Sequence, residues 1–119
     1  MSKTVLIVED VADIRTIMKL LLESYGYQAI TADDGYEAFE KFQKHQPDLV
    51  LMDLMMPVLD GLDATRIIRQ VGDNKTPILA VTAYPKRYHK KALEAGCNAV
   101  VPKPIDFANF KSFLQQFLS

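Results

Sequence analysis

Three short, unbroken runs of apolar residues constrain the fold of this chain more than any other feature of its sequence. Val5 to Val8, Leu49 to Met52 and Ile78 to Val81 contain no polar alternation, and together they are rich in β-branched residues. Strands with this composition are buried on both faces, which is typical of the centre of a parallel sheet. The three runs therefore predict the central strands of an α/β domain.

Two weaker runs predict edge strands. Tyr27 to Thr31 mixes apolar and polar residues, whereas Ala99 to Val101 is short and is followed by Pro102. Proline has no N–H to donate to a neighbouring strand, so it favours the edge or the end of a sheet. We expect both runs to lie at the margins of the sheet.

Amphipathic stretches separate the five runs and predict helices at about residues 14–25, 38–45, 62–71, 86–95 and 107–118. Strands and helices alternate five times, which implies a parallel sheet with right-handed crossovers and helices on both faces. Because the most apolar strands belong in the centre, the sequence predicts a doubly wound, five-stranded sheet of order 2-1-3-4-5 with flavodoxin-like topology.

The bulk composition limits the class of protein. A length of 119 residues suits one domain, and we expect residues 1–119 to form a single unit. The net charge of -1 argues against direct binding to nucleic acid or to a membrane surface. Cys97 is the only cysteine, which excludes an internal disulfide. The first apolar run is too short for a signal sequence or a membrane span, so we expect a cytoplasmic protein.

Acidic residues follow the central runs directly. Glu9 and Asp10 end the first run, and Asp53 ends the run that begins at Leu49. The carboxyl ends of parallel strands meet at one edge of the sheet, where these like charges would repel one another unless a cation lies among them. Carboxylates suit Mg²⁺, and the two histidines, His45 and His89, lie on predicted helix surfaces. The pattern predicts an oxygen-liganded divalent metal site.

Two further side chains indicate chemistry on a phosphoryl group. Lys103 ends the last run and can place a positive charge on a phosphoryl oxygen, and Thr82 ends the fourth run with a hydroxyl. A carboxylate beside Mg²⁺, flanked by a lysine and a hydroxyl, suits nucleophilic attack on phosphorus to form an aspartyl phosphate.

Four motifs in this order resemble the response-regulator receiver domain over essentially the whole chain. They are Val8-Glu9-Asp10, Leu51 to Pro57 with Gly61, Val81-Thr82-Ala83 and Lys103-Pro104. The chain is most similar to stand-alone, chemotaxis-type regulators, because no effector domain follows. The resemblance implies a two-component phosphorelay protein that serves as a phosphoacceptor switch rather than as an enzyme.

By resemblance, Asp53 is the phosphoacceptor and Lys103 contacts the phosphoryl group. Glu9, Asp10, Asp53 and the backbone carbonyl of Met55 are the implied ligands of Mg²⁺, with Mn²⁺ able to substitute.

The resemblance also assigns Thr82 as the switch hydroxyl and the Lys103–Pro104 bond as a cis peptide. Its implied partners are a sensor histidine kinase or a histidine phosphotransfer protein, and a downstream target protein. The resemblance also suggests a homodimer, formed through the face of the fourth and fifth helices.

The chain departs from the family at positions around the site. Val100 replaces an aromatic residue that normally turns inward as the threonine moves, so any switch must work mainly through Thr82 and the loop that follows it. By resemblance, Met55 and Tyr84 are the pair that flanks the path of attacking water, and neither has a carboxylate or amide to orient it. We therefore expect slow self-hydrolysis, on the order of minutes or longer.

Two other functions stay open at this point. A phosphatase of the haloacid-dehalogenase type also phosphorylates an aspartate, but it needs a second carboxylate two residues later, where this chain has Met55. A non-phosphorylated scaffold of the same fold is the second alternative, which Val100 leaves open.

Overall fold

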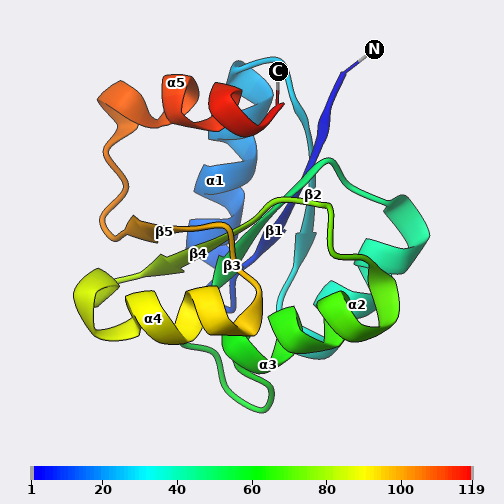
Figure 1. Ribbon diagram of the computed structural model, residues 1–119. Helices are drawn as coiled ribbons and strands as arrows, with labels where there is room; N and C mark the ends of the chain where they lie inside the picture. Colours follow the sequence, from blue (N-terminus) through cyan, green and yellow to red (C-terminus); the bar gives the residue numbers. More distant parts are fainter. Residues whose placement is uncertain (1, 119) are drawn as a thin grey trace.

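The computed structural model describes residues 2–118, which form a five-stranded parallel sheet with helices on both faces (Figure 1). The strand order is β2-β1-β3-β4-β5, which confirms the predicted doubly wound topology. The strands are β1 (Thr4–Val8), β2 (Gln28–Ala32), β3 (Leu49–Asp53), β4 (Ile78–Thr82) and β5 (Ala99–Pro102). The two weaker runs do form the edges, since β2 and β5 each pair with one neighbour.

Helices cover both faces of the sheet (Figure 1). On the first face lie α1 (Ala12–Ser24) and α5 (Phe107–Leu118). On the second face lie α2 (Gly35–His45), α3 (Gly61–Ile67) and α4 (Pro85–Ala95). Within residues 2–118, none of these helices is both long enough and apolar enough to cross a lipid bilayer.

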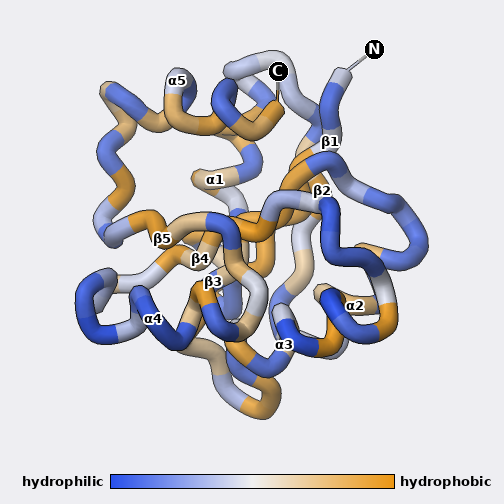
Figure 2. Tube along the Cα trace, in the orientation of Figure 1, coloured by the Kyte–Doolittle hydropathy of each residue, from blue (hydrophilic) through white to orange (hydrophobic). Residues whose placement is uncertain are grey.

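The central strands alternate their side chains between two apolar cores. Val5 and Ile7 pack toward α1 and α5, whereas Leu6 and Val8 pack toward α2, α3 and α4. All residues of β3 and β4 are buried, and Figure 2 shows apolar residues concentrated along the inner strands. Burial on both faces explains why these runs lack polar alternation.

The third helix differs from the prediction. The sequence pattern predicted one helix over residues 62–71, but the α-helix ends at Ile67 and the chain continues as a π-helix, η1 (Ile68–Gly72). Ile68 is fully buried at this widened turn. Arg69 donates hydrogen bonds to the Gly96 carbonyl (3.0 Å) and to the Asn98 Oδ1 (2.9 Å). These contacts come from distant parts of the chain, so local periodicity did not reveal them.

Candidate functional site

The sheet order brings the predicted site residues to one edge. Glu9 and Asp10 follow β1, Asp53 ends the neighbouring strand β3, Thr82 ends β4, and Lys103 follows β5. The chain reverses its winding direction between β1 and β3, and open α/β sheets place ligands in the crevice at such a point. The five residues therefore lie where a ligand site is expected in this architecture.

Three carboxylates form a compact cluster at this edge. One oxygen from each of Glu9, Asp10 and Asp53 lies within 4.8 Å of the others. Glu9 and Asp53 are buried, and Asp10 is half-buried. Hydrogen bonds hold two of them in place, since Glu9 Oε2 accepts the Val11 N–H (3.2 Å) and Asp53 Oδ1 accepts the Met55 N–H (3.1 Å).

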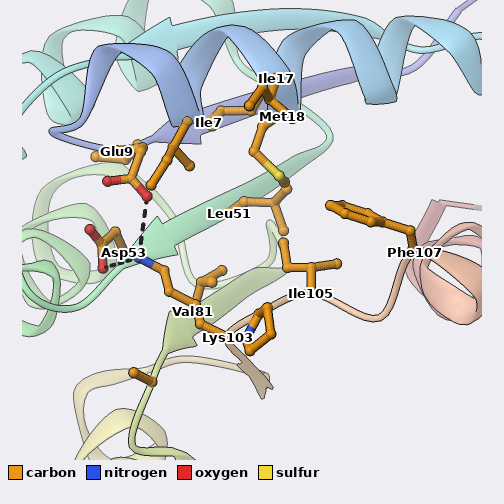
Figure 3. Close-up of a pocket in the computed structure, with 14 residues that line it drawn as sticks. Ile7, Glu9, Ile17, Met18, Leu51, Asp53, Val81, Lys103, Ile105 and Phe107 are labelled. Carbon is orange, nitrogen blue, oxygen red and sulfur yellow. Dashed lines mark hydrogen bonds and ion pairs between the residues drawn. The ribbon is translucent and has the colours of Figure 1, made fainter.

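Lys103 is the cation of the site. Its Nζ lies 3.2 Å from Glu9 Oε1 and 3.3 Å from Asp53 Oδ1, so the ammonium group bridges the two carboxylates (Figure 3). Its backbone N–H donates to the Thr82 carbonyl (2.9 Å), which ties the lysine to the end of β4. The Lys103–Pro104 peptide bond is cis, as expected.

The charges of the site are not balanced. The pKa of Asp53 is raised to about 7, first by burial and then by the Glu9 carboxylate, while Lys103 and the Met55 N–H oppose the rise. Burial by itself would lower the pKa of Lys103, but the carboxylates of Asp53 and Glu9 raise it above its usual value. One ammonium group thus does not neutralise the negative charge of three clustered carboxylates. A hard divalent cation fits this set of oxygen donors, because it would favour the ionised form of Asp53.

Thr82 is buried next to the acidic cluster. Its hydroxyl oxygen accepts the backbone N–H of Tyr84 (3.0 Å), so in this structure the hydroxyl is bonded within its own β4–α4 loop. Tyr84 and Met55, two residues after Thr82 and Asp53, are each about half exposed. Val100 is partly buried in β5, beside a cleft of about 360 Å³ that Pro85 also lines.

A groove that the sequence did not reveal opens next to the carboxylates. It has a volume of about 460 Å³ and lies between α1 and the segment that joins β5 to α5 (Figure 3). Glu9, Asp53 and Lys103 lie at its polar end. Most of its wall is apolar and includes Ile14, Ile17, Met18, Leu51, Ile105 and Phe107. The sequence feature that could have indicated the groove is the excess of apolar residues in α1, where Ile14, Ile17 and Leu20 remain exposed.

The family model of the response regulator receiver domain matches residues 5–115. The chain belongs to this family. Its members are receivers of two-component signalling, and the acidic cluster around Asp53 fits the phosphoacceptor site of such a receiver.

Individual relatives of this receiver cover nearly its whole length. The polar-differentiation response regulator DivK of Brucella anthropi is 32% identical over 99% of this chain and 98% of its own length. The chemotaxis protein CheY4 of Vibrio cholerae has 29% identity and a TM-score of 0.90, with 98% and 99% of the two chains covered.

One solved relative bears on the metal. The receiver domain of sensor histidine kinase PA1611 from Pseudomonas aeruginosa holds a magnesium ion in its active-site cleft. It is 33% identical to this receiver, with a TM-score of 0.88 and coverage of 99% and 98% of the two chains.

Proposed function

We propose that this receiver is a phosphorylation switch whose Asp53 accepts a phosphoryl group from the phosphohistidine of a sensor histidine kinase or phosphotransfer protein. The observation that carries the proposal is the placement of Asp53 within 4.8 Å of two further carboxylates and beside the Lys103 ammonium group. The reaction requires Mg²⁺, for which Mn²⁺ substitutes. The phosphorylated form then binds a downstream protein.

The chemistry uses the residues in separate roles. A carboxylate oxygen of Asp53 attacks phosphorus, the P–N bond of the phosphohistidine breaks, and its electron pair stays on the imidazole nitrogen. Lys103 would stabilise the negative charge of a phosphoryl oxygen. Glu9 and Asp10 would hold Mg²⁺ together with Asp53 and the Met55 carbonyl. Bound there, Mg²⁺ would offset the repulsion between the carboxylates and the phosphoryl group.

Thr82 would carry the response to phosphorylation. If its hydroxyl turns toward the phosphoryl group, the N–H of Tyr84 loses its acceptor, and the β4–α4 loop must rearrange. Val100 is too small to sweep a large volume, so we assign the conformational signal to this loop. The switch is a two-state equilibrium that the phosphoryl group shifts.

The same residues favour a long-lived switch over a hydrolase. Met55 and Tyr84 offer no carboxylate or amide side chain to orient water, so self-hydrolysis of the phosphorylated form is slow. The DivK and CheY4 relatives are matched over nearly their entire length. The single buried thiol of Cys97 suits the reducing cytoplasm.

The groove beside α1 is the proposed contact for the phosphodonor protein. Asp53 is only 3% exposed, so a donor must approach the rim of the site closely. The apolar groove is continuous with Asp53 and Lys103, and its exposed wall includes Ile17 and Phe107. A donor with an apolar surface next to its phosphohistidine would bury this wall.

Labelling with acetyl phosphate tests the proposal directly. Wild-type protein is incubated with Mg²⁺ and radiolabelled acetyl phosphate beside two variants, Asp53→Ala and the exposed-site control Asp13→Asn. We expect one acid-stable, base-labile phosphate on wild type and on the control, and none on Asp53→Ala. Continuous release of phosphate would identify a hydrolase, and equal labelling of all three proteins, or of none, would contradict the switch.

A further inference from the structure

The groove beside α1 has the size and the lining of a small-molecule site. Its volume of about 460 Å³ falls within the range of roughly 300–1,000 Å³ that such sites occupy. Ile7, Leu51 and Val81, from three neighbouring strands, line it on the side of the sheet. The outer walls include Ile17 of α1 and Phe107 of α5, which are both more than half exposed. A bound molecule would therefore remove exposed apolar surface from water.

One end of the groove carries an excess of negative charge. Within residues 2–118, the charged side chains that line it are those of Glu9, Asp53 and Lys103. Glu9 and Asp53 are 4% and 3% exposed, and the Lys103 ammonium group lies 3.2 Å and 3.3 Å from their carboxylate oxygens. When both carboxylates are ionised, this one ammonium group leaves one negative charge without a counter-charge. An anionic ligand would be repelled here, whereas a ligand with a single positive charge would be attracted.

The charged end and the apolar walls belong to one continuous space. Figure 3 shows Glu9 and Asp53 at one end of the groove and Phe107 at the other, with Leu51 and Ile105 between them. A neutral apolar molecule would match the walls but would leave the carboxylates without a counter-charge. A ligand that matches both parts has an apolar chain and a positively charged head group at one end.

We propose that the groove beside α1 binds a small amphiphilic amine, whose ammonium group pairs with Glu9 and Asp53 and whose apolar chain lies between α1 and Phe107. The amine uses two of the carboxylates proposed to hold Mg²⁺, so the amine and Mg²⁺ weaken each other's binding by the same factor. It also covers the wall proposed to contact the phosphodonor protein, and it therefore inhibits phosphorylation of Asp53. This inhibition rests on the proposed function, whereas the binding of the amine does not.

A series of n-alkylamines provides the probe. Hexylamine and octylamine are titrated into the full-length protein without Mg²⁺ at about pH 8, where an alkylamine is protonated. Octanoate and octanol are the anionic and neutral controls for octylamine. Octylamine should bind about tenfold more tightly than hexylamine, because burying each methylene strengthens binding about fourfold. It should also bind about tenfold more tightly than either control, and the amide chemical shifts that move should belong to residues 14–18, 51–53 and 103–107.

A substitution at the charged end tests the head group. Glu9→Gln removes one charge but keeps an oxygen that can accept the Val11 N–H. The preference for octylamine over octanol should fall about tenfold in this variant. Asp13→Asn removes a charge from an exposed position of α1 and should leave the preference unchanged. Circular dichroism verifies that both variants fold.

Substitutions in the walls test the apolar chain. Ile17→Ala combined with Phe107→Ala removes apolar surface on both sides of the groove and should weaken octylamine about tenfold. Leu20→Ala combined with Leu93→Ala truncates two exposed apolar residues outside the groove and should leave the affinity nearly unchanged. In both double variants the preference for octylamine over octanoate should persist, since the charged end is intact.

Labelling by acetyl phosphate relates binding to function. Octylamine should slow labelling of wild-type protein in proportion to the fraction of the groove that it occupies, and added Mg²⁺ should relieve the inhibition. Octanoate at the same concentration should leave labelling unchanged. If protein without amine is not labelled at Asp53, the proposed function is wrong. If that protein is labelled and octylamine does not bind, the amine proposal alone is wrong.

Other outcomes would also overturn the amine proposal. Octanoate or octanol that binds as tightly as octylamine would exclude a role for the carboxylates. An affinity that does not depend on chain length, or chemical shifts confined to residues outside the groove, would exclude the apolar walls. Binding that Mg²⁺ does not weaken, or that leaves labelling unchanged, would show that the amine does not share the carboxylates.

Discussion

At the scale of single residues, Asp53 combines burial with like-charged neighbours. The folded protein holds the Asp53 proton up to about pH 7, whereas an unfolded chain releases it near the ordinary value of 3.8. Between these values the folded state binds more protons than the unfolded state. The free energy of unfolding contributed by this group is therefore highest at low pH and falls as pH rises toward 7. Ionisation of Asp53, which makes the carboxylate a nucleophile, therefore lowers the free energy of unfolding of the protein.

Replacing Asp53 by asparagine should stabilise the protein, and more so at high pH. Asparagine keeps the size of the side chain but removes the buried charge. Relative to wild type, we expect Asp53→Asn to increase the free energy of unfolding by about 2 kcal/mol more at pH 8 than at pH 5. Urea unfolding in EDTA measures this difference. Asp13→Asn, at an exposed position of α1, should show no such pH dependence, and a loss of stability in Asp53→Asn at pH 8 would refute the electrostatic account.

Met55 should control the lifetime of the phosphorylated state. Asparagine at this position offers an amide that can orient water, so Met55→Asn should speed loss of the phosphoryl group by about tenfold. The decay of radiolabelled protein after removal of acetyl phosphate gives the rate. Val58→Asn places the same amide in the same loop at a residue that is 87% exposed, and it should leave the rate unchanged. Decay of wild type within seconds would contradict slow hydrolysis.

At the scale of elements, the loop from β3 to α3 fixes the position of Asp53. Gly61 donates its N–H to the Leu54 carbonyl (3.2 Å), and a Cβ at this position would collide with the backbone carbonyl of Asp53. Asp60 caps α3 by accepting the Asp63 N–H (2.9 Å). The first turn of α3 thus packs directly against the end of β3, so only glycine is accommodated at position 61.

Gly61→Ala should therefore disturb both stability and the site. We expect a loss of about 2 kcal/mol or more in the free energy of unfolding, together with slower labelling by acetyl phosphate. Gly72→Ala is the matched control. There the new Cβ would meet atoms of the Phe42 ring and no backbone atom at such short range, so the loss should be smaller. Equal losses in the two variants would show that the contact with Asp53 is not the cause.

The groove along α1 leads to a prediction about phosphotransfer. Ile17→Asp places a charge in the apolar wall of the groove, whereas Leu20→Asp places it on the same helix outside the groove. With a histidine phosphotransfer protein that phosphorylates wild type, Ile17→Asp should slow transfer at least tenfold and Leu20→Asp less than threefold. Both variants should accept phosphate from acetyl phosphate at the wild-type rate. If both substitutions slowed transfer equally, the proposal that the donor protein contacts the groove would be contradicted.

At the scale of the whole molecule, the sheet assembles one site from distant segments. Strand order alone places Glu9 beside Asp53, and the contact between Lys103 and Glu9 joins residues 94 positions apart. A ligand that binds these segments together stabilises only the folded chain. The global stability of the protein is therefore a direct measure of metal binding.

Mg²⁺ should raise the free energy of unfolding of wild type by about 1–3 kcal/mol at pH 8 when its concentration is well above the dissociation constant. The shift is measured as the difference in thermal midpoint with and without about 10 mM Mg²⁺. The ionic strength is kept constant so that charge screening is the same in both samples. Asp10→Asn removes one proposed ligand and should abolish most of the shift. No response of wild type to Mg²⁺ or Mn²⁺ would contradict the metal site.

The sequence predicted most of the fold, because its strands are buried on both faces and their apolar runs are unbroken. It also located the acidic cluster, since carboxylates that end parallel strands must meet at one edge. The π-helix after Ile67 was not predicted, because the contacts of Ile68 and Arg69 involve distant residues. The groove between α1 and the segment that joins β5 to α5 was missed for the same reason.

Local pattern thus determined the elements, their order in the sheet and the residue types at its carboxyl edge. Tertiary structure alone decided how far Asp53 is buried, where the Lys103 ammonium group lies, and which apolar side chains of α1 stay exposed. The spacing of apolar residues along the sequence indicates whether a side chain faces a core. The distance between two charges and the space between two helices depend on packing between segments far apart in sequence, and no local pattern encodes them.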